Sequence, residues 1–503
     1  MVTSNSNGAS KVGTDRIPVS PTAGGAVERG WAVAGTYRGR TVALLAALAA
    51  LAVLAGGGPA HPAVPTERGG PAAGAPSASP AAPVVLQPAV QQGTDGAPTT
   101  AGVQAALGTL TTDKALAELS FAIVDAGTGK LLLGGNETAP ATPASTTKVA
   151  TSVAALSLLP QQTRLTTKVV RGTAPDEIVL VGGGDPTLTG LNRDQIRIGG
   201  APVDADSAPA SMPELARQTA AALKAAGLTT VHLGYDTSLF TGSPFHPFND
   251  GTDLGPMTAL MVDEGRITAT DDVDAPGRVE DPTGQAVAEF TALLATQGVK
   301  VADKPKEEQA QTGATVLGQV QSPTVVRLIE RALTNSDNTL AEAIGRQVAL
   351  ASHQPAGYEG AGAATLAELT KLGVPTQGVQ LFDGSGMNSR NTIPAAALAE
   401  LVALAASPDH PRLRPALTGM PIAGFTGTLR SRYTADQGTA DGAGIVRAKT
   451  GSLSGVSTLA GTVVDADGRV LAFALMSKGA DDAGAAHTAM DRIVVKLAAC
   501  GCH

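Results

Sequence analysis

The sequence predicts an α+β fold in which helices pack on an antiparallel sheet and an α/β subdomain interrupts the chain. Strand-turn-strand patterns lie at both ends of the folded region. They pair residues 121–125 with 131–133 near its start, and 457–465 with 469–476 near its end. Helical patterns fill the sequence between these two hairpins. Such an order favours one antiparallel sheet with helices packed against it.

The helical segments are recognised by their periodic apolar residues and their caps. The final segment places Met490, Ile493, Val494 and Leu497 on one face, as an amphipathic helix requires. The predicted helices cover residues 145–159, 325–351, 361–372, 394–406 and 487–499.

Between residues 164 and 270 the sequence alternates between strand and helix patterns. Residues 178–181 and 231–235 have the composition of buried strands. Between them, Ser211 and Glu214 form a capping box for a helix that ends at Gly227. We therefore expect an inserted subdomain over residues 164–270, and a main domain built from residues 106–163 and 271–503.

The first 105 residues are expected to precede the folded domains. Residues 1–40 are predicted to be a disordered tail. Residues 41–57 are apolar after a basic flank, a pattern typical of an export signal or a membrane anchor. Residues 58–105 are rich in Pro, Ala and Gly, as in a linker. The segment predicts an extracytoplasmic protein, either secreted to the cell wall or held at the cell membrane; the two alternatives stay open.

The composition argues against several classes of function. A net charge of −8 and an aromatic content of 3% argue against a nucleic acid partner. The histidines and cysteines show no metal-binding spacing, so we expect no metal and no cofactor. The only cysteines, Cys500 and Cys502, could form a local disulfide, pair with another chain or have no role.

Three short motifs carry the chemistry. They are Ser145-Thr-Thr-Lys148, Ser336-Asp-Asn338 and Lys449-Thr-Gly451, in this order along the chain. This is the motif set of penicillin-binding proteins and serine β-lactamases. A serine hydroxyl is a weak nucleophile that needs a base in contact. Lys148, one helical turn after Ser145, is the predicted base if burial lowers the pKa of its amine.

The other motif residues have predicted roles in the same reaction. Ser336 is expected to relay a proton to the leaving amine, and Asn338 to hold the acyl-side amide of the substrate. Lys449 and Thr450 are expected to bind a terminal carboxylate. The amide of Ser452, with the amide of Ser145 at the helix start, is expected to stabilise the oxyanion.

The sequence around these motifs resembles a known family. The stretches Pro143–Lys148, 182–188, 236–240, Asp383–Gly386, 424–429 and 448–453 occur in the order found in D-alanyl-D-alanine carboxypeptidase/endopeptidases, the class C low-molecular-mass penicillin-binding proteins. The resemblance covers residues 110 to 500. It implies a transpeptidase-like domain with an insertion between the first two motifs.

The resemblance also implies the activity. It indicates a serine carboxypeptidase, with a possible endopeptidase activity, that acts on peptidoglycan stem peptides and is inhibited by β-lactam antibiotics. In relatives, an acidic residue of the insertion binds the amino end of the diaminopimelate side chain, and Asp250 occupies the similar segment here. The alternatives are a serine β-lactamase and a non-catalytic envelope protein that only binds peptidoglycan or penicillin.

Overall fold

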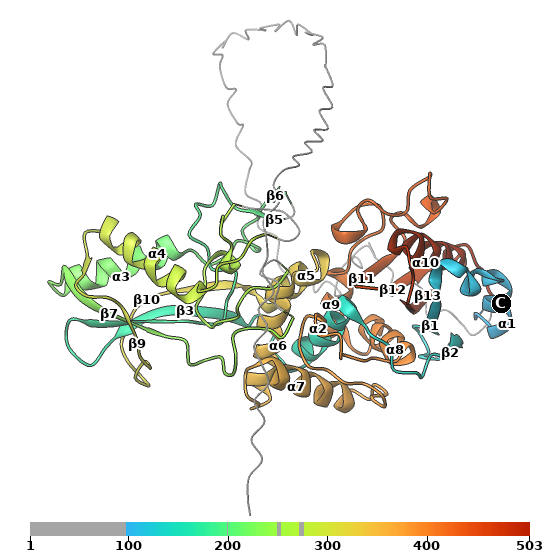
Figure 1. Cartoon of the computed structure of the whole chain (residues 1–503), viewed down its shortest axis with the longest axis horizontal. Coiled ribbons are helices and arrows are strands. Elements are labelled where there is room, and N and C mark those ends of the chain that lie inside the picture. Colours follow the sequence, from blue (N-terminus) through green and yellow to red (C-terminus); the bar gives the residue numbers. More distant parts are fainter. Residues whose placement is uncertain (1–96, 199, 249–252, 271–275) are drawn as a thin grey trace, which may run out of the picture. The chain divides into compact units, whose positions relative to one another are not determined.

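Two β-sheets, each covered by helices, organise the described part of the chain (Figure 1). The computed structural model describes residues 97–503 except 199, 249–252 and 271–275. The first sheet has five antiparallel strands in the order β11-β12-β13-β1-β2. The strands are β1 (Glu118–Asp125), β2 (Leu131–Gly135), β11 (Arg447–Leu453), β12 (Val456–Val464) and β13 (Val470–Lys478).

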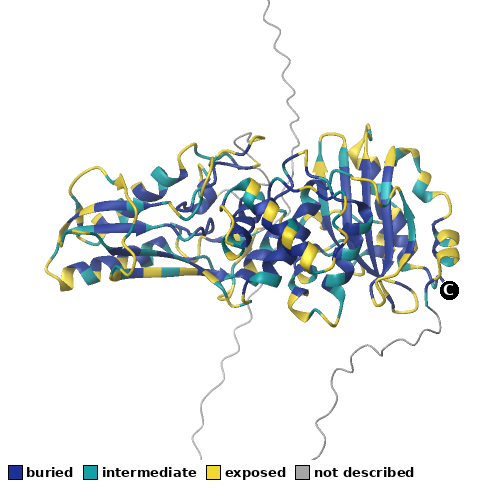
Figure 2. Ribbon diagram, turned by 90° about the horizontal axis from the view of Figure 1, so that it is seen from below, coloured by how far each residue is buried: buried dark blue, intermediate teal, exposed yellow. Residues whose placement is uncertain are grey.

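Helices cover both faces of this sheet, which explains why its central strands are apolar throughout. Along β13, Ala472 and Ala474 face one core, while Leu471, Phe473 and Leu475 face the other. Successive side chains of a strand point to opposite faces, so small residues line one side and large residues the other. Figure 2 shows these strands as a buried layer.

The small-residue face packs against a helical layer, and the large-residue face packs against α10 and α1. Helix α8 lies directly on β1, β12 and β13. The helices of this domain are α1 (Thr100–Leu107), α2 (Thr147–Leu158), α5 (Val325–Thr334), α6 (Asn338–Ala351), α7 (Tyr358–Lys371), α8 (Ala395–Ala406), the short α9 (Pro415–Thr418) and α10 (Ala483–Ala498). This arrangement confirms the predicted α+β class.

The second sheet has six strands and belongs to the insertion. Its main order is β10-β3-β4-β7-β8, with β9 also paired to β7. Helices α3 (Met212–Ala225) and α4 (Pro282–Thr296) share its apolar core. The strands are β3 (Arg164–Arg171), β4 (Glu177–Val181), β7 (Thr230–Asp236), β8 (Lys300–Val301), β9 (Lys306–Glu307) and β10 (Val316–Thr324); β5 (Arg197–Ile198) and β6 (Ala201–Pro202) form a separate hairpin.

Two predicted boundaries need correction. The insertion was expected to end at residue 270, but its sheet continues to Thr324 because β10 pairs with β3 along its length. The linker was expected to reach residue 105, but α1 already begins at Thr100. The Thr99 hydroxyl caps this helix by accepting from the Gly102 amide at 3.0 Å, and Val103 and Leu107 are buried in the core beside α10.

The helical stretch predicted over residues 325–351 is two helices. Ser336 adopts a φ of 57°, which ends α5, and the Asp337 side chain caps α6 by accepting from the Leu340 amide at 2.9 Å. A non-glycine residue in the left-handed region is uncommon and usually marks a special position. Here it falls on the first residue of the second motif.

The chain ends beside its first described helix. Cys500 and Cys502 form the local disulfide, one of the three alternatives left open by the sequence. The Cys502 carbonyl accepts from the Thr99 amide at 2.6 Å. The predicted tail, the apolar segment 41–57 and nearly all of the linker lie outside the described residues. Within the residues that are described, no helix has the length and apolarity needed to cross a bilayer.

The packing of α10 on the sheet generates a stability prediction. Phe473 of β13 is fully buried in the apolar core that the sheet shares with α10. Phe473→Ala is expected to lower the free energy of unfolding by about 3–5 kcal/mol, because it removes apolar contacts and leaves a cavity. Val470→Ala, at a position that is 38% exposed on the same strand, is the control and should cost less than about 1 kcal/mol. Equal losses in denaturant unfolding would contradict this packing.

Candidate active site

Ser145 lies in a short 3-10 turn, Ala144–Thr146, that leads directly into α2. Lys148 follows one turn later, so both side chains lie on one side of the helix start. The Lys148 amine donates to the Ser145 hydroxyl, with 2.8 Å between Nζ and Oγ. The first predicted motif therefore forms the Ser-Lys contact that nucleophile activation needs.

The Lys148 amine is held by two further acceptors. It donates to Oδ1 of Asn338 at 2.6 Å and to the backbone carbonyl of Ser385 at 2.8 Å. The side chain is only 1% exposed. Burial lowers its pKa to about 8, although the nearby carboxylates of Asp383 and Glu342 oppose that shift. At neutral pH about a tenth of such an amine is unprotonated, far more than for an ordinary lysine.

A second buried lysine stands close by on β11. The Lys449 amine donates to the Ser336 hydroxyl at 2.9 Å and to the carbonyl of Thr450 at 2.6 Å. Burial, together with the positive charge of Lys148, lowers the pKa of Lys449 well below its ordinary value. The two lysines thus bring together the three motifs: Lys148 links the first to the second, and Lys449 links the second to the third.

Strand β11 approaches the nucleophile closely because residue 451 is glycine. A Cβ atom there would lie 2.9 Å from the Ser145 amide nitrogen and 2.9 Å from the Pro143 carbonyl oxygen. Its neighbour Thr450 shares a hydrogen bond of 2.7 Å with the hydroxyl of Thr428. Ser452 is exposed on the same strand. The predicted residues Thr450 and Ser452 therefore flank the glycine that faces Ser145.

The carbonyl of Ser385 is a part of the site that the sequence interpretation missed. Oε1 of Glu342 accepts from the Ser385 and Gly384 amides at 2.8 and 3.1 Å, and this fixes the loop that presents the carbonyl to Lys148. Glu342 lies one turn after Asn338 on α6, so one helix positions two of the lysine's acceptors. The spacing of Asn338 and Glu342, and the Asp-Gly-Ser-Gly stretch, were the available signals.

The loop that contains Ser385 is also stabilised by the buried carboxylate of Asp383. Asp383 accepts from the Gly386 and Asn388 amides, at 3.0 and 2.6 Å, and from the Asn391 side chain at 2.6 Å. It also contacts Nε2 of His246 at 3.0 Å. Burial would raise the pKa of Asp383, but the hydrogen bonds from His246 and Asn391 hold it below its usual value.

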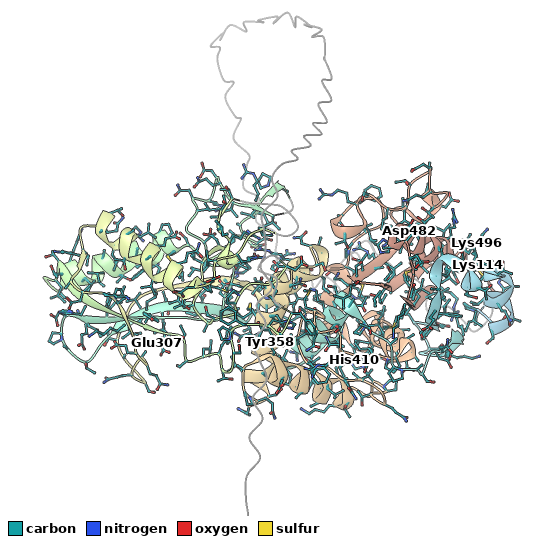
Figure 3. All side chains as sticks on the ribbon, viewed as in Figure 1. Lys114, Glu307, Tyr358, His410, Asp482 and Lys496 are labelled. Atoms are coloured by element: carbon teal, nitrogen blue, oxygen red, sulfur yellow. A yellow bond between two sulfur atoms is a disulfide. The ribbon has the colours of Figure 1, made fainter. Side chains whose placement is uncertain are left out.

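His246, Glu342 and Asp383 lie close enough together to resemble a cation site. Each of their carboxylate oxygens already has a donor from the chain itself, including Arg346, which contacts Oε2 of Glu342 at 3.3 Å. Tyr358, labelled in Figure 3, covers the guanidinium of Arg346 at 4.1 Å from its ring centre. These contacts fit a structural network that supports the loop under Lys148.

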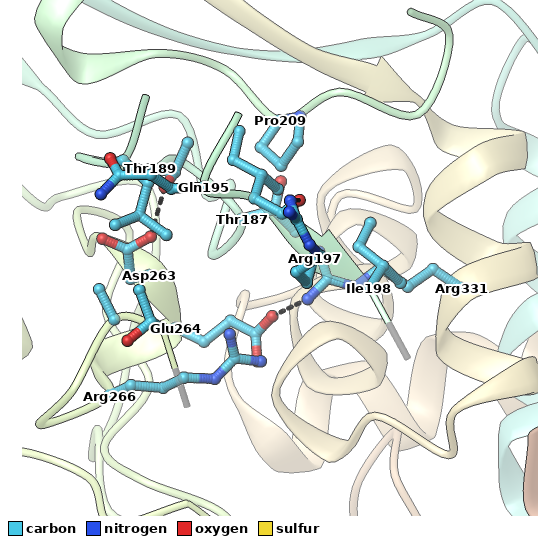
Figure 4. A pocket seen from close by; sticks show the side chains of 14 residues that line it. Thr187, Thr189, Gln195, Arg197, Ile198, Pro209, Asp263, Glu264, Arg266 and Arg331 are labelled. Carbon is cyan, nitrogen blue, oxygen red and sulfur yellow. Dashed lines mark hydrogen bonds and ion pairs between the residues drawn. The ribbon is translucent and has the colours of Figure 1, made fainter. Parts of the chain in front are cut away.

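The insertion supports the second motif through a buried ionic cluster, which borders a polar pocket (Figure 4). Glu264 pairs with Arg331 on α5, and Arg331 lies 3.6 Å from Asp337, the central residue of the motif. Burial would raise the pKa of Glu264, but the cations of Arg331, Arg266 and Arg278 lower it to about 2. Glu264 is therefore ionised, and it links the insertion to the end of α5.

The structure thus brings together seven of the eight residues predicted for the site. The exposed Ser452 follows Thr450 on β11. The other six are connected by the contacts of the two lysine amines and by β11; they are Ser145, Lys148, Ser336, Asn338, Lys449 and Thr450. Asp250 lies outside the described residues, so its predicted role remains a prediction. The first described residue after it is Asp253, whose carbonyl accepts from the side-chain amide of Asn338 at 3.1 Å.

Fold and site together define a class of protein: the penicillin-binding serine enzymes, which place a Ser-Lys pair beside a KTG strand. The comparisons agree with this class. A sequence profile of the D-Ala-D-Ala carboxypeptidase 3 (S13) family matches residues 103–278 and 271–500. The chain belongs to this family, and it is a peptidase of that class. The family predicted from the motifs is confirmed.

One curated relative and two solved structures illustrate the similarity. Carboxypeptidase DacB from Mycolicibacterium smegmatis is 36% identical over 414 residues, which cover 80% of this chain and 85% of the relative. The crystal structure of penicillin binding protein 4 (dacB) from Haemophilus influenzae matches with a TM-score of 0.62 at 20% identity, covering 78% of this chain and 97% of that one. Its complex with a novel β-lactam matches with a TM-score of 0.59 at 20% identity, covering 77% and 97%. The two structures confirm the predicted fold.

The contact between Glu342 and the Ser385 loop generates a prediction. In Glu342→Gln the side chain loses the charge that pairs with Arg346 and one of its acceptor oxygens, so the Ser385 carbonyl should shift from Lys148. We expect acylation by penicillin to slow by about ten- to a hundredfold. The acid limb of its pH profile should move to lower pH, because a charge that raises the pKa of Lys148 is removed.

Glu359→Gln is the matched control, since Glu359 is exposed at the start of α7. It should leave both the acylation rate and the pH profile unchanged. A Glu342→Gln variant that loses stability but keeps the wild-type rate and pH profile would show that Glu342 is only structural.

Proposed function

We propose that this protein is a serine D-Ala-D-Ala carboxypeptidase that acts on peptidoglycan stem peptides through an acyl-enzyme on Ser145. One observation carries the proposal: the buried amine of Lys148, with its pKa lowered to about 8, lies 2.8 Å from the Ser145 hydroxyl. A neutral amine at this distance can accept the hydroxyl proton as the oxygen attacks the carbonyl between the two D-alanines.

The remaining motif residues have roles in the same step. The amides of Ser145 and Ser452 stabilise the oxyanion, while Asn338 holds the amide on the acyl side. Lys449 and Thr450 bind the carboxylate of the terminal D-alanine. Its amine leaves after it receives the serine proton through Lys148 and Ser336. Water then hydrolyses the ester and restores the Ser145 hydroxyl. Asp250 remains the candidate for binding the amino end of the third stem-peptide residue.

The family supports a peptidoglycan substrate and inhibition by β-lactams, since a structurally similar protein has been crystallised with a β-lactam. Such a substrate lies outside the cytoplasm. We therefore extend the proposal to an extracytoplasmic location, reached through the apolar segment 41–57, which is either cleaved or kept as a membrane anchor.

Replacing the nucleophile tests the assignment directly. Ser145→Ala should abolish D-alanine release from a muropeptide that ends in D-Ala-D-Ala, because no other group forms the ester. Release is measured by coupled D-alanine detection. Ser407→Ala, far along the chain at the end of α8, should keep wild-type activity. Activity that survives in Ser145→Ala would remove Ser145 from the mechanism.

Penicillin distinguishes this function from the two alternatives. Mass spectrometry should find one penicilloyl adduct on Ser145 that persists for many minutes. Rapid turnover of the adduct would instead identify a β-lactamase. An unmodified Ser145, with no D-alanine release, would identify a protein that only binds the cell wall.

The pH dependence of acylation follows from the lowered pKa of Lys148. The active form of the base is the neutral amine, and protonation below the pKa removes it. The acylation rate should therefore rise about tenfold per pH unit up to pH about 8 and then level off. Stopped-flow acylation with a chromogenic β-lactam measures this profile. A rate that is already constant between pH 6 and 8 would contradict the role of Lys148.

A further inference from the structure

A groove opens beside the active site between α5, the turn at residues 426–430 and the β5–β6 hairpin of the insertion. Its cavity volume is about 310 Å³. Asn335, Thr426, Gly427 and Arg430 line one end, and Pro202 lines the hairpin side. D-alanine is a small leaving group, and the two residues proposed to bind its carboxylate, Lys449 and Thr450, do not line this groove.

The groove adjoins the residues proposed to handle the leaving group. Asn335 directly precedes Ser336, whose hydroxyl contacts Lys449. On the other wall, Thr428 of the 426–430 turn contacts the hydroxyl of Thr450. The turn packs closely on the end of α5, because a Cβ atom on Gly427 would lie 2.0 Å from the Thr334 carbonyl oxygen. The groove therefore lies next to the segments that carry Ser336 and Thr450.

The position of the groove along β11 gives its relation to the scissile bond. The proposed carboxylate site at Thr450 and the proposed oxyanion donor at Ser452 lie on opposite sides of Gly451, which faces Ser145. The 426–430 turn contacts the Thr450 side of this pair. With the carboxylate of the leaving residue bound at Thr450, this groove lies on the side of the leaving residue and not on that of the acyl residue.

The groove contains one unengaged cation. Arg327 is paired with Glu330 at 2.8 Å, and Arg331 is paired with Glu264. The exposed guanidinium of Arg430 forms no ion pair or hydrogen bond with any residue that the structure describes. The acidic lining residue Asp204 already accepts from two backbone amides, at 2.9 and 2.8 Å. Arg430 is thus available to an anionic ligand, and a guanidinium binds carboxylates well.

We propose that this groove binds the peptide strand that leaves when a cross-link between two stem peptides is cut, and that Arg430 binds a carboxylate of that strand. The proposal rests on the serine mechanism above and adds a site for its larger substrate. The Ser145 oxygen forms an ester with the D-alanine carbonyl while the amide C–N bond breaks. The serine proton goes to the departing amine, which belongs to the second stem peptide. Water then hydrolyses the ester.

The test compares two substrates on the full-length protein. One is a muropeptide monomer ending in D-Ala-D-Ala, and the other is a muropeptide dimer joined by a D-alanyl-diaminopimelate bond. The wild type should hydrolyse both. Arg430→Glu should lower kcat/KM for the dimer by about tenfold, because it replaces an attraction with a repulsion. D-alanine release from the monomer and acylation by penicillin should stay within about twofold of wild type.

Two further variants make the result specific. Arg492→Glu introduces the same charge change at an exposed position on α10 and should leave both substrates unaffected. Ala201→Trp adds a bulky side chain to the hairpin wall of the groove and should slow dimer cleavage alone. Penicillin acylation reports that each variant is folded.

The outcomes separate the groove from the catalytic proposal. If the monomer is hydrolysed but the dimer is not, or if Arg430→Glu cleaves the dimer at the wild-type rate, the groove proposal is wrong and the carboxypeptidase stands. If Arg430→Glu lowers both activities equally, the groove has no specific relation to the leaving strand. If neither substrate is hydrolysed and Ser145 is not acylated, the proposed function itself fails.

Discussion

The structure depends on the burial of two lysine amines side by side. Moving an ammonium group out of water is costly, and a protein meets that cost by pairing the charge or by releasing the proton. Burial lowers the pKa of Lys148, but the nearby carboxylates of Asp383 and Glu342 partly offset this, so the pKa falls only to about 8. The shift of Lys449 has no opposing cause, because both its burial and the charge of Lys148 favour the neutral form. A substrate carboxylate beside Lys449 would restore its charge.

The rest of the fold keeps these amines in place. Glycines let three separate segments pack closely at the site. Gly451 allows β11 to approach the start of α2. Gly386, with a φ of 89°, lies where a Cβ atom would be 1.9 Å from the Ala144 carbonyl oxygen. The loop that contains Gly386 is fixed by Glu342 and Asp383. The insertion adds support from the other side, because Glu264 holds Arg331 next to the second motif. A rigid surrounding of this kind is what preorganised catalysis requires.

Much of this architecture could be predicted from the sequence. The three motifs have residue types and spacings set by chemistry, and the hairpins and capped helices follow from local patterns, so the α+β fold, the family and the contacts of Ser145 and Lys148 were within reach. Other features depend on contacts between distant residues. The pairing of β10 with β3 joins segments about 150 residues apart and extends the insertion beyond its expected end. The Ser385 acceptor is a backbone carbonyl, which no side-chain pattern can mark. The break at Ser336 is a left-handed residue in a stretch whose apolar periodicity continues across it.

The most direct test of this account is the titration of the Lys148 amine itself. Lysine labelled with carbon-13 at Cε reports protonation by NMR, and the Lys148→Arg variant identifies the signal. A midpoint at pH about 8 is expected for this amine in the free protein. A midpoint near 10.5, the value of a lysine in water, would mean that the amine is solvated and charged at neutral pH. It could not then act as the base for Ser145, and the central claim would be contradicted.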